Sequence, residues 1–282
     1  MTRKPDHLTR AGNVAATMPP LLLAAEQVAH GFMQGAHGRR RAGVGETFWQ
    51  YRAWQAGDTA RDIDWRQSAK RDGHYVRQNE WEAAQAVFLW RDASSSMRAH
   101  GKKNYADVLL LALGIVLLAG NERIGLIGGS ARPQSSHDTI YRLSEDLPAQ
   151  TTWDAALHAI PRGAQVVLIG DFYMPPDDIA AFCTQLAARD VKGMLVQLTA
   201  PDERDLAHRG HIRFCDPEGV LPEMQVPQAA ALRDEYRARF QAHRQALVDI
   251  TARLGWQYVA AGTEDTPETT LAHIYAGLTG KG

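Results

Sequence analysis

Short apolar runs alternate with helical segments from Val87 to the end of the chain, and this alternation constrains the fold more than any other feature. A run that is too short for an ordinary helix and rich in β-branched residues predicts a buried strand. The clearest example is Gln165–Gly170 (QVVLIG). Because strands separated by helices usually form a parallel sheet, the sequence predicts an α/β fold with a doubly wound, mostly parallel sheet and helices on both faces.

The expected strands begin with the run at Val87 and continue at Arg123–Ile127, Thr139–Leu143 (short), Gln165–Gly170, Gly193–Thr199 and Trp256–Ala260. The expected helices are Lys103–Gly120, one opening at Thr151–Leu157, Asp177–Arg189, Gln228–Leu254 and Thr269–Leu278. The helix Lys103–Gly120 is apolar nearly all round, which is typical of a helix that is covered on more than one side. Cys183 falls on an apolar helix face and is predicted to be a core residue.

Composition and charge are those of an ordinary globular protein, with 45% hydrophobic and 22% charged residues and a formal net charge of -1. This charge gives no general attraction to nucleic acid or to an anionic membrane. Two cysteines without a C-x-x-C spacing disfavour a disulfide framework and a structural zinc site. The longest apolar run, Val108–Ala119, is shorter than the roughly 20 residues that a membrane span needs. A cytoplasmic location is expected.

The first strand ends in a polar loop that is the leading candidate for a binding site. Asp92, Ser94 and Ser96 stand at i, i+2 and i+4 after the run VFLW. In an open α/β sheet, ligands bind in the loops past the carboxyl ends of the strands. One carboxylate and two hydroxyls are hard oxygen donors, which suit Mg2+ or Mn2+ rather than zinc. The alternative is that these residues cap the next helix.

Residues 38–82 interleave aromatic residues with arginines, a pattern that nucleic-acid-binding proteins use. Acidic residues, among them Glu46 and Asp72, stand within the same stretch and would repel a phosphate backbone. We therefore expect no nucleic acid, and predict that Arg52, Asp58, Arg61 and Asp64 form a buried or half-buried structural ion network.

Several enzyme motifs are excluded by their spacing. No G-x-G-x-x-G follows the first strand, and no phosphate-binding G-x-x-x-x-G-K-[ST] occurs. Gly128-Gly129-Ser130 resembles a nucleophile elbow, but the required glycine is replaced by Arg132. His208 and His211 have no third ligand at a usable spacing and are predicted to be surface residues. No catalytic residue is assigned.

Three features together resemble the metal-ion-dependent adhesion site of von Willebrand factor A domains: the D-x-S-x-S of Asp92 to Ser96, Thr151 before a helix, and Asp171 after the central strand. Thr152 is the alternative to Thr151. The resemblance implies that Asp92, Ser94, Ser96, Thr151 and Asp171 hold a divalent cation, Mg2+ or Mn2+. One coordination position would stay open for an acidic side chain of a partner.

The block G-x-G-E-x-F-W-x-Y-R-x-W-x-x-G-D-x-x-R-x-I-D-W-R-x-S-A, at Gly43–Ala69, resembles the signature of the bacterial DUF58 family. The resemblance implies an N-terminal region at residues 1–83, with a loose tail, a short helix at Leu21–Met33 and the Arg/Trp-rich block. A von Willebrand factor A-like domain then follows at 84–282. Family genes commonly lie beside one for a MoxR-type AAA+ ATPase. The transmembrane anchor of many relatives is not expected in this chain.

The function expected from this resemblance is non-enzymatic. The chain would be a metal-dependent protein-binding module, acting as an adaptor or co-chaperone with a MoxR-type AAA+ ATPase on a client protein. Two alternatives remain: a metal-independent interaction domain of the same fold, and a metal-dependent phosphoesterase that uses the same oxygens.

Overall fold

The computed structural model divides the chain into two compact units. The larger contains α2 (Pro20–His37) and the chain from Gln85 onward, and the smaller is Arg39–Ala84. The structure describes residues 19–37, 48–55, 63–70, 73–79, 85–129, 132–136, 138–149, 157, 159–205, 212–214, 224–226 and 232–280.

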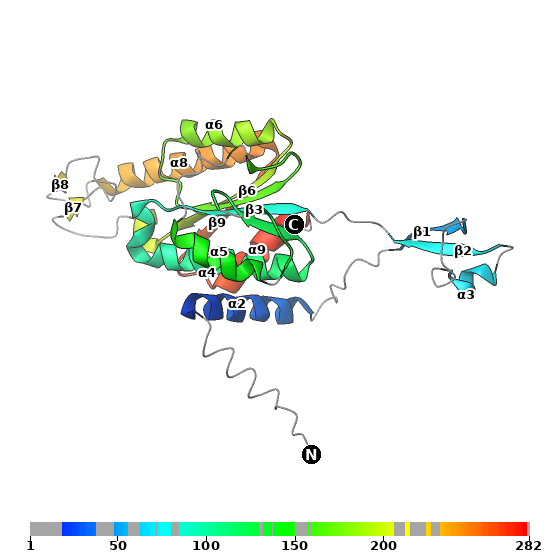
Figure 1. Cartoon of the computed structure of the whole chain (residues 1–282). Coiled ribbons are helices and arrows are strands. Elements are labelled where there is room, and N and C mark those ends of the chain that lie inside the picture. Colours follow the sequence, from blue (N-terminus) through cyan, green and yellow to red (C-terminus); the bar gives the residue numbers. More distant parts are fainter. Residues whose placement is uncertain are drawn as a thin grey trace, which may run out of the picture. The chain divides into compact units, whose positions relative to one another are not determined.

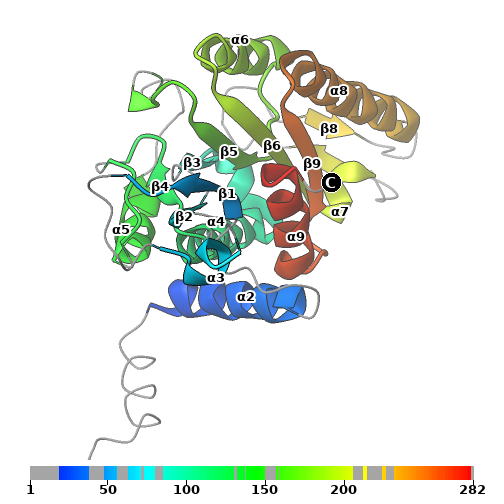
Figure 2. The ribbon, with the colours of Figure 1, turned by 90° about the vertical axis from the view of Figure 1, so that its right-hand side faces the viewer.

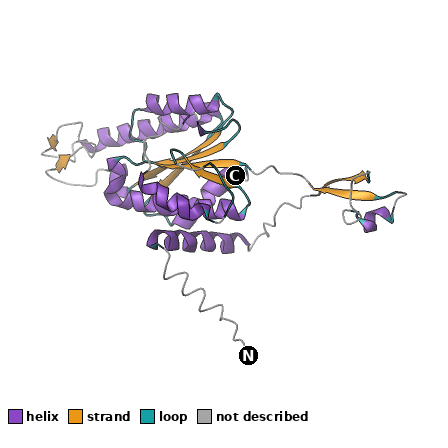
Figure 3. Ribbon diagram, viewed as in Figure 1, coloured by secondary structure: helices purple, strands orange, loops and turns teal. Residues whose placement is uncertain are grey.

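A five-stranded sheet forms the centre of the larger unit (Figures 1 and 3). Its strands are β3 (Ala86–Arg91), β4 (Arg123–Leu126), β5 (Gln165–Gly170), β6 (Lys192–Thr199) and β9 (Gln257–Gly262). They lie in the order β4-β3-β5-β6-β9, and every neighbouring pair is parallel. The predicted doubly wound α/β fold class is confirmed.

The strand order reverses between β3 and β5. After β3 the chain moves outward to β4, and it then returns to the other side of β3 for β5, β6 and β9. Such a reversal is a topological switch point, where loops diverge past the carboxyl ends of the strands and leave room for a ligand. Asp92 and Asp171 are the residues that directly follow β3 and β5.

Helices cover both faces of the sheet (Figure 2). One face packs against α4 (Lys102–Ala119), α5 (Thr139–Asp146) and α9 (Pro267–Leu278). The other packs against α6 (Pro176–Ala187) and α8 (Arg233–Leu254). The alternation within β5 follows from the period of two in a strand, because Val167 and Ile169 belong to the first core and Val166 and Leu168 to the second.

Helix α4 is buried on nearly all sides because α2 covers the side that the sheet does not. The fully buried Leu22, Ala25 and Ala29 of α2 belong to the same core as α4. The predicted double coverage of this helix is confirmed. The boundary between the two units at Ala84 and Gln85 lies one residue from the expected division at 83 and 84. The expected N-terminal region needs a correction at its start, since α2 packs with the sheet unit. Its apolar face requires the partner that α4 provides.

The expected strand Thr139–Leu143 is wrong, because these residues begin α5. Ile140, Leu143 and Leu147 are buried at helical spacing, and Ile140 packs beside Gly114 of α4.

Cys183 is fully buried, as expected, and burial raises the pKa of its thiol to about 12. Its thiol is therefore un-ionised at neutral pH.

The remaining elements are short. In the smaller unit, β1 (Phe48–Ala53) pairs antiparallel with β2 (Tyr75–Asn79), and α3 is Trp65–Ser68. In the larger unit, β7 (Ile212–Phe214) pairs antiparallel with β8 (Met224–Val226). The last pieces are η1 (Ser95–Gly101), η2 (Leu147–Ala149) and α7 (Pro201–Arg204). Among the described residues, no helix combines the length and apolar character that a membrane span requires.

Candidate functional site

The two aspartates that follow β3 and β5 lie on neighbouring loops. Arg91 pairs with Ile169 across the two strands, and the Asp92 amide donates to the Ile169 carbonyl at 2.8 Å. The Asp92 side chain lies against Gly170, where an added Cβ would stand 2.7 Å from the Asp92 Cβ. Gly170 thus allows Asp92 to approach the loop that carries Asp171. Both aspartates are almost completely buried.

The two serine hydroxyls lie close to each other in the loop that begins at Asp92. The Oδ1 of Asp92 accepts a hydrogen bond from the Ser94 amide at 2.8 Å, which fixes the loop. The hydroxyl oxygens of Ser94 and Ser96 are 3.0 Å apart, and both residues are half-buried. Ser94 is the N-cap of η1, yet its side chain makes no capping hydrogen bond, and the N-cap of α4 is Gly101. Helix capping therefore does not account for these hydroxyls.

The arrangement of these oxygens fits a divalent cation. Mg2+ binds six oxygens at about 2.0–2.1 Å, so adjacent ligands of its octahedron are about 3 Å apart. The two hydroxyl oxygens have this separation, which also suits a hydrogen bond between them. Neutral hydroxyls beside a carboxylate are hard donors of the kind that Mg2+ and Mn2+ prefer. Asp92, Ser94 and Ser96 would hold the ion directly or through water.

Lys102 is a site residue that the sequence did not reveal. It is the first residue of α4, and its side chain is fully buried. Its Nζ donates to the Oδ2 of Asp171 at 2.7 Å and also forms an ion pair with Glu203. Asp171, which was expected to serve a metal, is therefore already paired with a cation of the protein itself. Its Oδ1 receives a long hydrogen bond, 3.4 Å, from the Tyr173 amide.

Glu203 reaches the site from α7, which follows the carboxyl end of β6. One of its oxygens pairs with Lys102, and the other accepts from the Ala200 amide at 2.8 Å. The hydroxyl of Tyr236, from α8, donates to the Glu203 carbonyl at 2.7 Å. Glu203 is thus held by α4, by α8 and by the N-cap of its own helix.

Tyr173 lies at the rim of this cluster. The Lys102 Nζ stands 5.1 Å from the centroid of its ring, within the range of a cation–π interaction. Burial raises the pKa of Tyr173, and the negative charges of Glu203 and Asp171 raise it further, so the phenol remains protonated. The residue is nevertheless 41% exposed, which makes it an aromatic surface beside the candidate ion site.

A second cationic side chain, Arg91, lies directly before Asp92. Its Nη1 donates to the Asp92 carbonyl at 3.1 Å, and its Nε pairs with Asp107 at 2.8 Å. Asp107 also pairs with the partly exposed Lys103. The carboxylates at this edge of the sheet therefore lie among cationic side chains of the protein itself.

Some predicted residues lie outside the part of the chain that the structure describes. They are Thr151 with its alternative Thr152, Asp58 and Arg61 of the expected ion network, and His208 and His211. The side chain of Arg52 is likewise not described. Asp64 is half-buried, and its amide donates to the Tyr75 carbonyl at 2.9 Å. The ion network and the role of Thr151 stay predictions.

Comparison with known proteins identifies the family. Residues 50–246 match the family described as "Protein of unknown function DUF58". The chain belongs to the DUF58 family. The uncharacterised proteins Rv1480 of Mycobacterium tuberculosis and Mb1516 of Mycobacterium bovis are each 24% identical to it over 254 residues, which cover 82% of this chain and 79% of theirs. The family description assigns no activity.

Two solved structures resemble the chain more distantly. One is an aerotolerance-related membrane protein from Bacteroides fragilis, 16% identical, and the other is the conserved hypothetical protein BatB from Bacteroides thetaiotaomicron, 15% identical. Each similarity covers 70% of this chain and 100% of the other, with a TM-score of 0.41.

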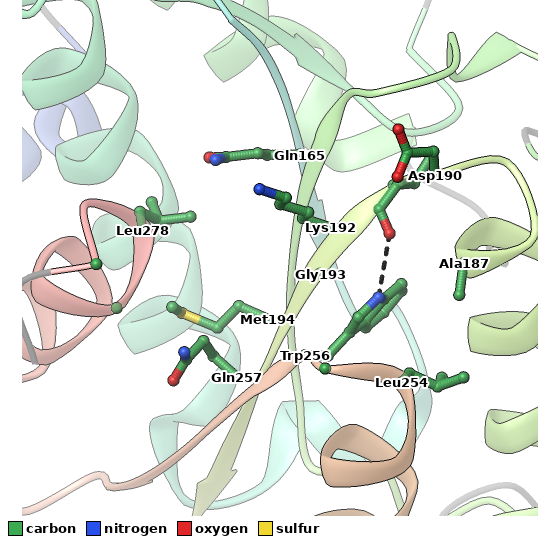
Figure 4. A pocket seen from close by; sticks show the side chains of 14 residues that line it. Gln165, Ala187, Asp190, Lys192, Gly193, Met194, Leu254, Trp256, Gln257 and Leu278 are labelled. Atoms are coloured by element: carbon green, nitrogen blue, oxygen red, sulfur yellow. Dashed lines mark hydrogen bonds between the residues drawn. The ribbon is translucent and has the colours of Figure 1, made fainter.

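A separate cavity of about 450 Å³ lies at the opposite end of the strands (Figure 4). It is lined by the first residues of β5, β6 and β9, namely Gln165, Lys192 and Gln257. Trp256 forms one wall by lying against Gly193, and its indole N–H donates to the Val191 carbonyl at 3.1 Å. None of the described site residues lines this cavity, so it is not the candidate ion site.

Proposed function

We propose that this chain is a non-enzymatic protein-binding module that uses a divalent cation at Asp92, Ser94, Ser96 and Asp171, with Thr151 as a further ligand. The observation that carries the proposal is the 3.0 Å separation of the Ser94 and Ser96 hydroxyls beside Asp92, at the switch point of the sheet. The fold and this set of residues resemble a von Willebrand factor A domain with its metal-ion-dependent adhesion site.

The ion would act as a docking point rather than as a catalyst. Hydroxyl ligands leave more positive charge on the ion than carboxylates do, so an acidic side chain of a partner can complete its coordination. The exposed ring of Tyr173 beside the site would give that partner an aromatic contact surface. We therefore expect the client to offer an aspartate or glutamate.

The second partner in the proposal is a MoxR-type AAA+ ATPase. Its support is the DUF58 membership together with the gene neighbourhood that the family resemblance implies. In this arrangement the module would be an adaptor or co-chaperone that brings the client to the ATPase.

Calorimetric titration with Mg2+ and Mn2+ tests the ion site. We expect saturable heat from the wild type and at least a tenfold weaker affinity in Asp92→Ala, because the loop loses its carboxylate. Ser95→Ala is the matched control, since Ser95 stands between the two proposed hydroxyl ligands. Equal heats from the wild type and Asp92→Ala would contradict the proposal. Metal-dependent hydrolysis of a generic phosphoester, lost in Asp171→Ala, would instead favour the phosphoesterase.

A metal-independent interaction domain is the second candidate, and the Lys102–Asp171 ion pair favours it because Asp171 already has a cation. Capture of the ATPase on immobilised protein separates the two candidates. Capture that a chelator abolishes supports metal-dependent docking. Capture that is equal with and without chelator, and equal in Asp92→Ala, supports the metal-independent domain.

A further inference from the structure

Lys102 is unusual because its whole side chain is inside the protein. Its accessible surface is zero, and its Nζ lies between the carboxylates of Asp171 and Glu203. A buried ammonium is tolerated only when opposite charges and hydrogen bonds replace the water that it has lost. Here two carboxylates from two different loops do so, and the ring of Tyr173 covers the group at 5.1 Å.

The two carboxylates also depend on Lys102. Asp171 follows β5 and Glu203 lies on α7 after β6, so both reach the carboxyl edge of the sheet from neighbouring strands. A buried carboxylate and a half-buried one that share a site repel each other unless a cation stands between them. Proteins usually supply that cation as a bound metal ion or as a side chain. In this chain it is supplied by the first residue of α4.

We infer that Lys102 is a built-in cation of the site, whose ammonium occupies the position between Asp171 and Glu203 that a metal ion would otherwise take. The ion pairs of Lys102 therefore connect β5, α7 and α4 at the carboxyl edge of the sheet without a metal ion. An ion at Asp92, Ser94 and Ser96 would bind to an edge that is already folded. The inference concerns the Oδ2 of Asp171 and the carboxylate of Glu203, whereas the ion of the proposed function would use the Oδ1 of Asp171. The two can therefore be tested separately.

The first test removes the charge and keeps the length of the side chain. In chelator-treated buffer we expect Lys102→Met to melt about 6–20 °C below the wild type, because breaking a buried ion pair is strongly destabilising. Lys103→Met is the matched control. Lys103 is the next residue and forms a partly exposed pair with Asp107, so its loss should lower the melting temperature by only about 2 °C. Equal losses in the two variants would overturn the inference.

The second test separates charge from packing. Neutralising both carboxylates in Lys102→Met/Asp171→Asn/Glu203→Gln removes the charges that Lys102 compensates. We expect this triple variant to melt at least half-way back toward the wild type, even if Lys102→Met alone fails to fold. A triple variant as unstable as the single one would show that the stem of Lys102 matters rather than its charge, and would overturn the inference.

The third test asks whether a metal ion can take the vacated position. It is made in the Asp92→Ala background, so that an ion at the serines does not contribute. Millimolar Mg2+ or Ca2+ should raise the melting temperature of Asp92→Ala/Lys102→Ala by several degrees and leave Asp92→Ala alone unchanged. The absence of a rise in the double variant would overturn the inference without touching the proposed function. Failure of the calorimetric titration at the serines would leave this result intact.

Discussion

The two halves of the candidate site differ in the charged groups that they contain. In the lysine half (Lys102, Asp171 and Glu203) the cation is part of the chain, Lys102 and Asp171 are buried, and Glu203 is half-buried. In the hydroxyl half (Asp92, Ser94 and Ser96) a single carboxylate stands beside two half-buried neutral hydroxyls. Where the protein supplies its own counter-charge, the group contributes mainly to stability. For the hydroxyl half, our proposal is that a bound divalent cation completes the group and that the group serves recognition.

The largest effect is expected from Asp171→Ala, which tests whether the lysine half is structural. Removing this carboxylate leaves Lys102 buried with Glu203 alone, so the free energy of unfolding should fall by about 3–5 kcal/mol. Urea denaturation followed by circular dichroism measures it. The exposed Asp249 provides the control, and Asp249→Ala should change stability by only about 0.5 kcal/mol. If Asp171→Ala lowered the free energy of unfolding as little as Asp249→Ala, the lysine half would not be structural.

Gly170→Ala should have an intermediate effect, and it probes the contact between the two loops. The new Cβ would stand 2.7 Å from the Asp92 Cβ, so Asp92 must shift. Such overpacking costs about 1–3 kcal/mol, and we expect Mg2+ affinity measured by calorimetry to fall with it. Gly35→Ala in α2 has open space around its Cβ and should be neutral or slightly stabilising. Unchanged Mg2+ affinity in Gly170→Ala would contradict the close approach of the loops.

The smallest effect is expected from Tyr173→Leu. It removes the ring that faces the Lys102 ammonium, an interaction of about 0.5–1 kcal/mol for a partly exposed residue. Chelator-treated protein should therefore lose little stability, and Mg2+ affinity should stay within about twofold of the wild type. Binding of an acidic partner should weaken more than either. Should Mg2+ binding collapse while stability is retained, Tyr173 would belong to the hydroxyl half.

Most of the sheet was predictable because its strands carry strong local signals. The runs at Val87 and Gln165–Gly170 are too short and too rich in apolar residues for surface helices, and the structure has strands at both. The segment Thr139–Leu143 misled because a threonine, an isoleucine and a tyrosine favour a strand over so short a window. In the structure, packing of Ile140 and Leu143 against α4 stabilises a helix at this position instead.

The site was predictable only in part, for a related reason. The proximity of Asp92 and Asp171 could be predicted from the sequence, since both residues directly follow strands of one parallel sheet. Glu203 also follows a strand, but it stands in a charged segment where nothing in the sequence distinguishes an inward carboxylate from its solvated neighbours. Lys102 precedes an apolar helix, a position where a lysine is ordinarily exposed. Only the three-dimensional structure shows that it turns inward.

The packing of α2 on α4 has a consequence for the order of events during synthesis. Lys102, where α4 begins, comes 65 residues after His37, where α2 ends. At roughly 5–20 residues per second, a ribosome needs about 3–13 s to cover that distance. Throughout this interval the apolar stripe of Leu22, Ala25 and Ala29 has been made before its eventual partner. We therefore expect these apolar side chains to stay uncovered on the nascent chain for seconds, which is long enough for a chaperone to bind them.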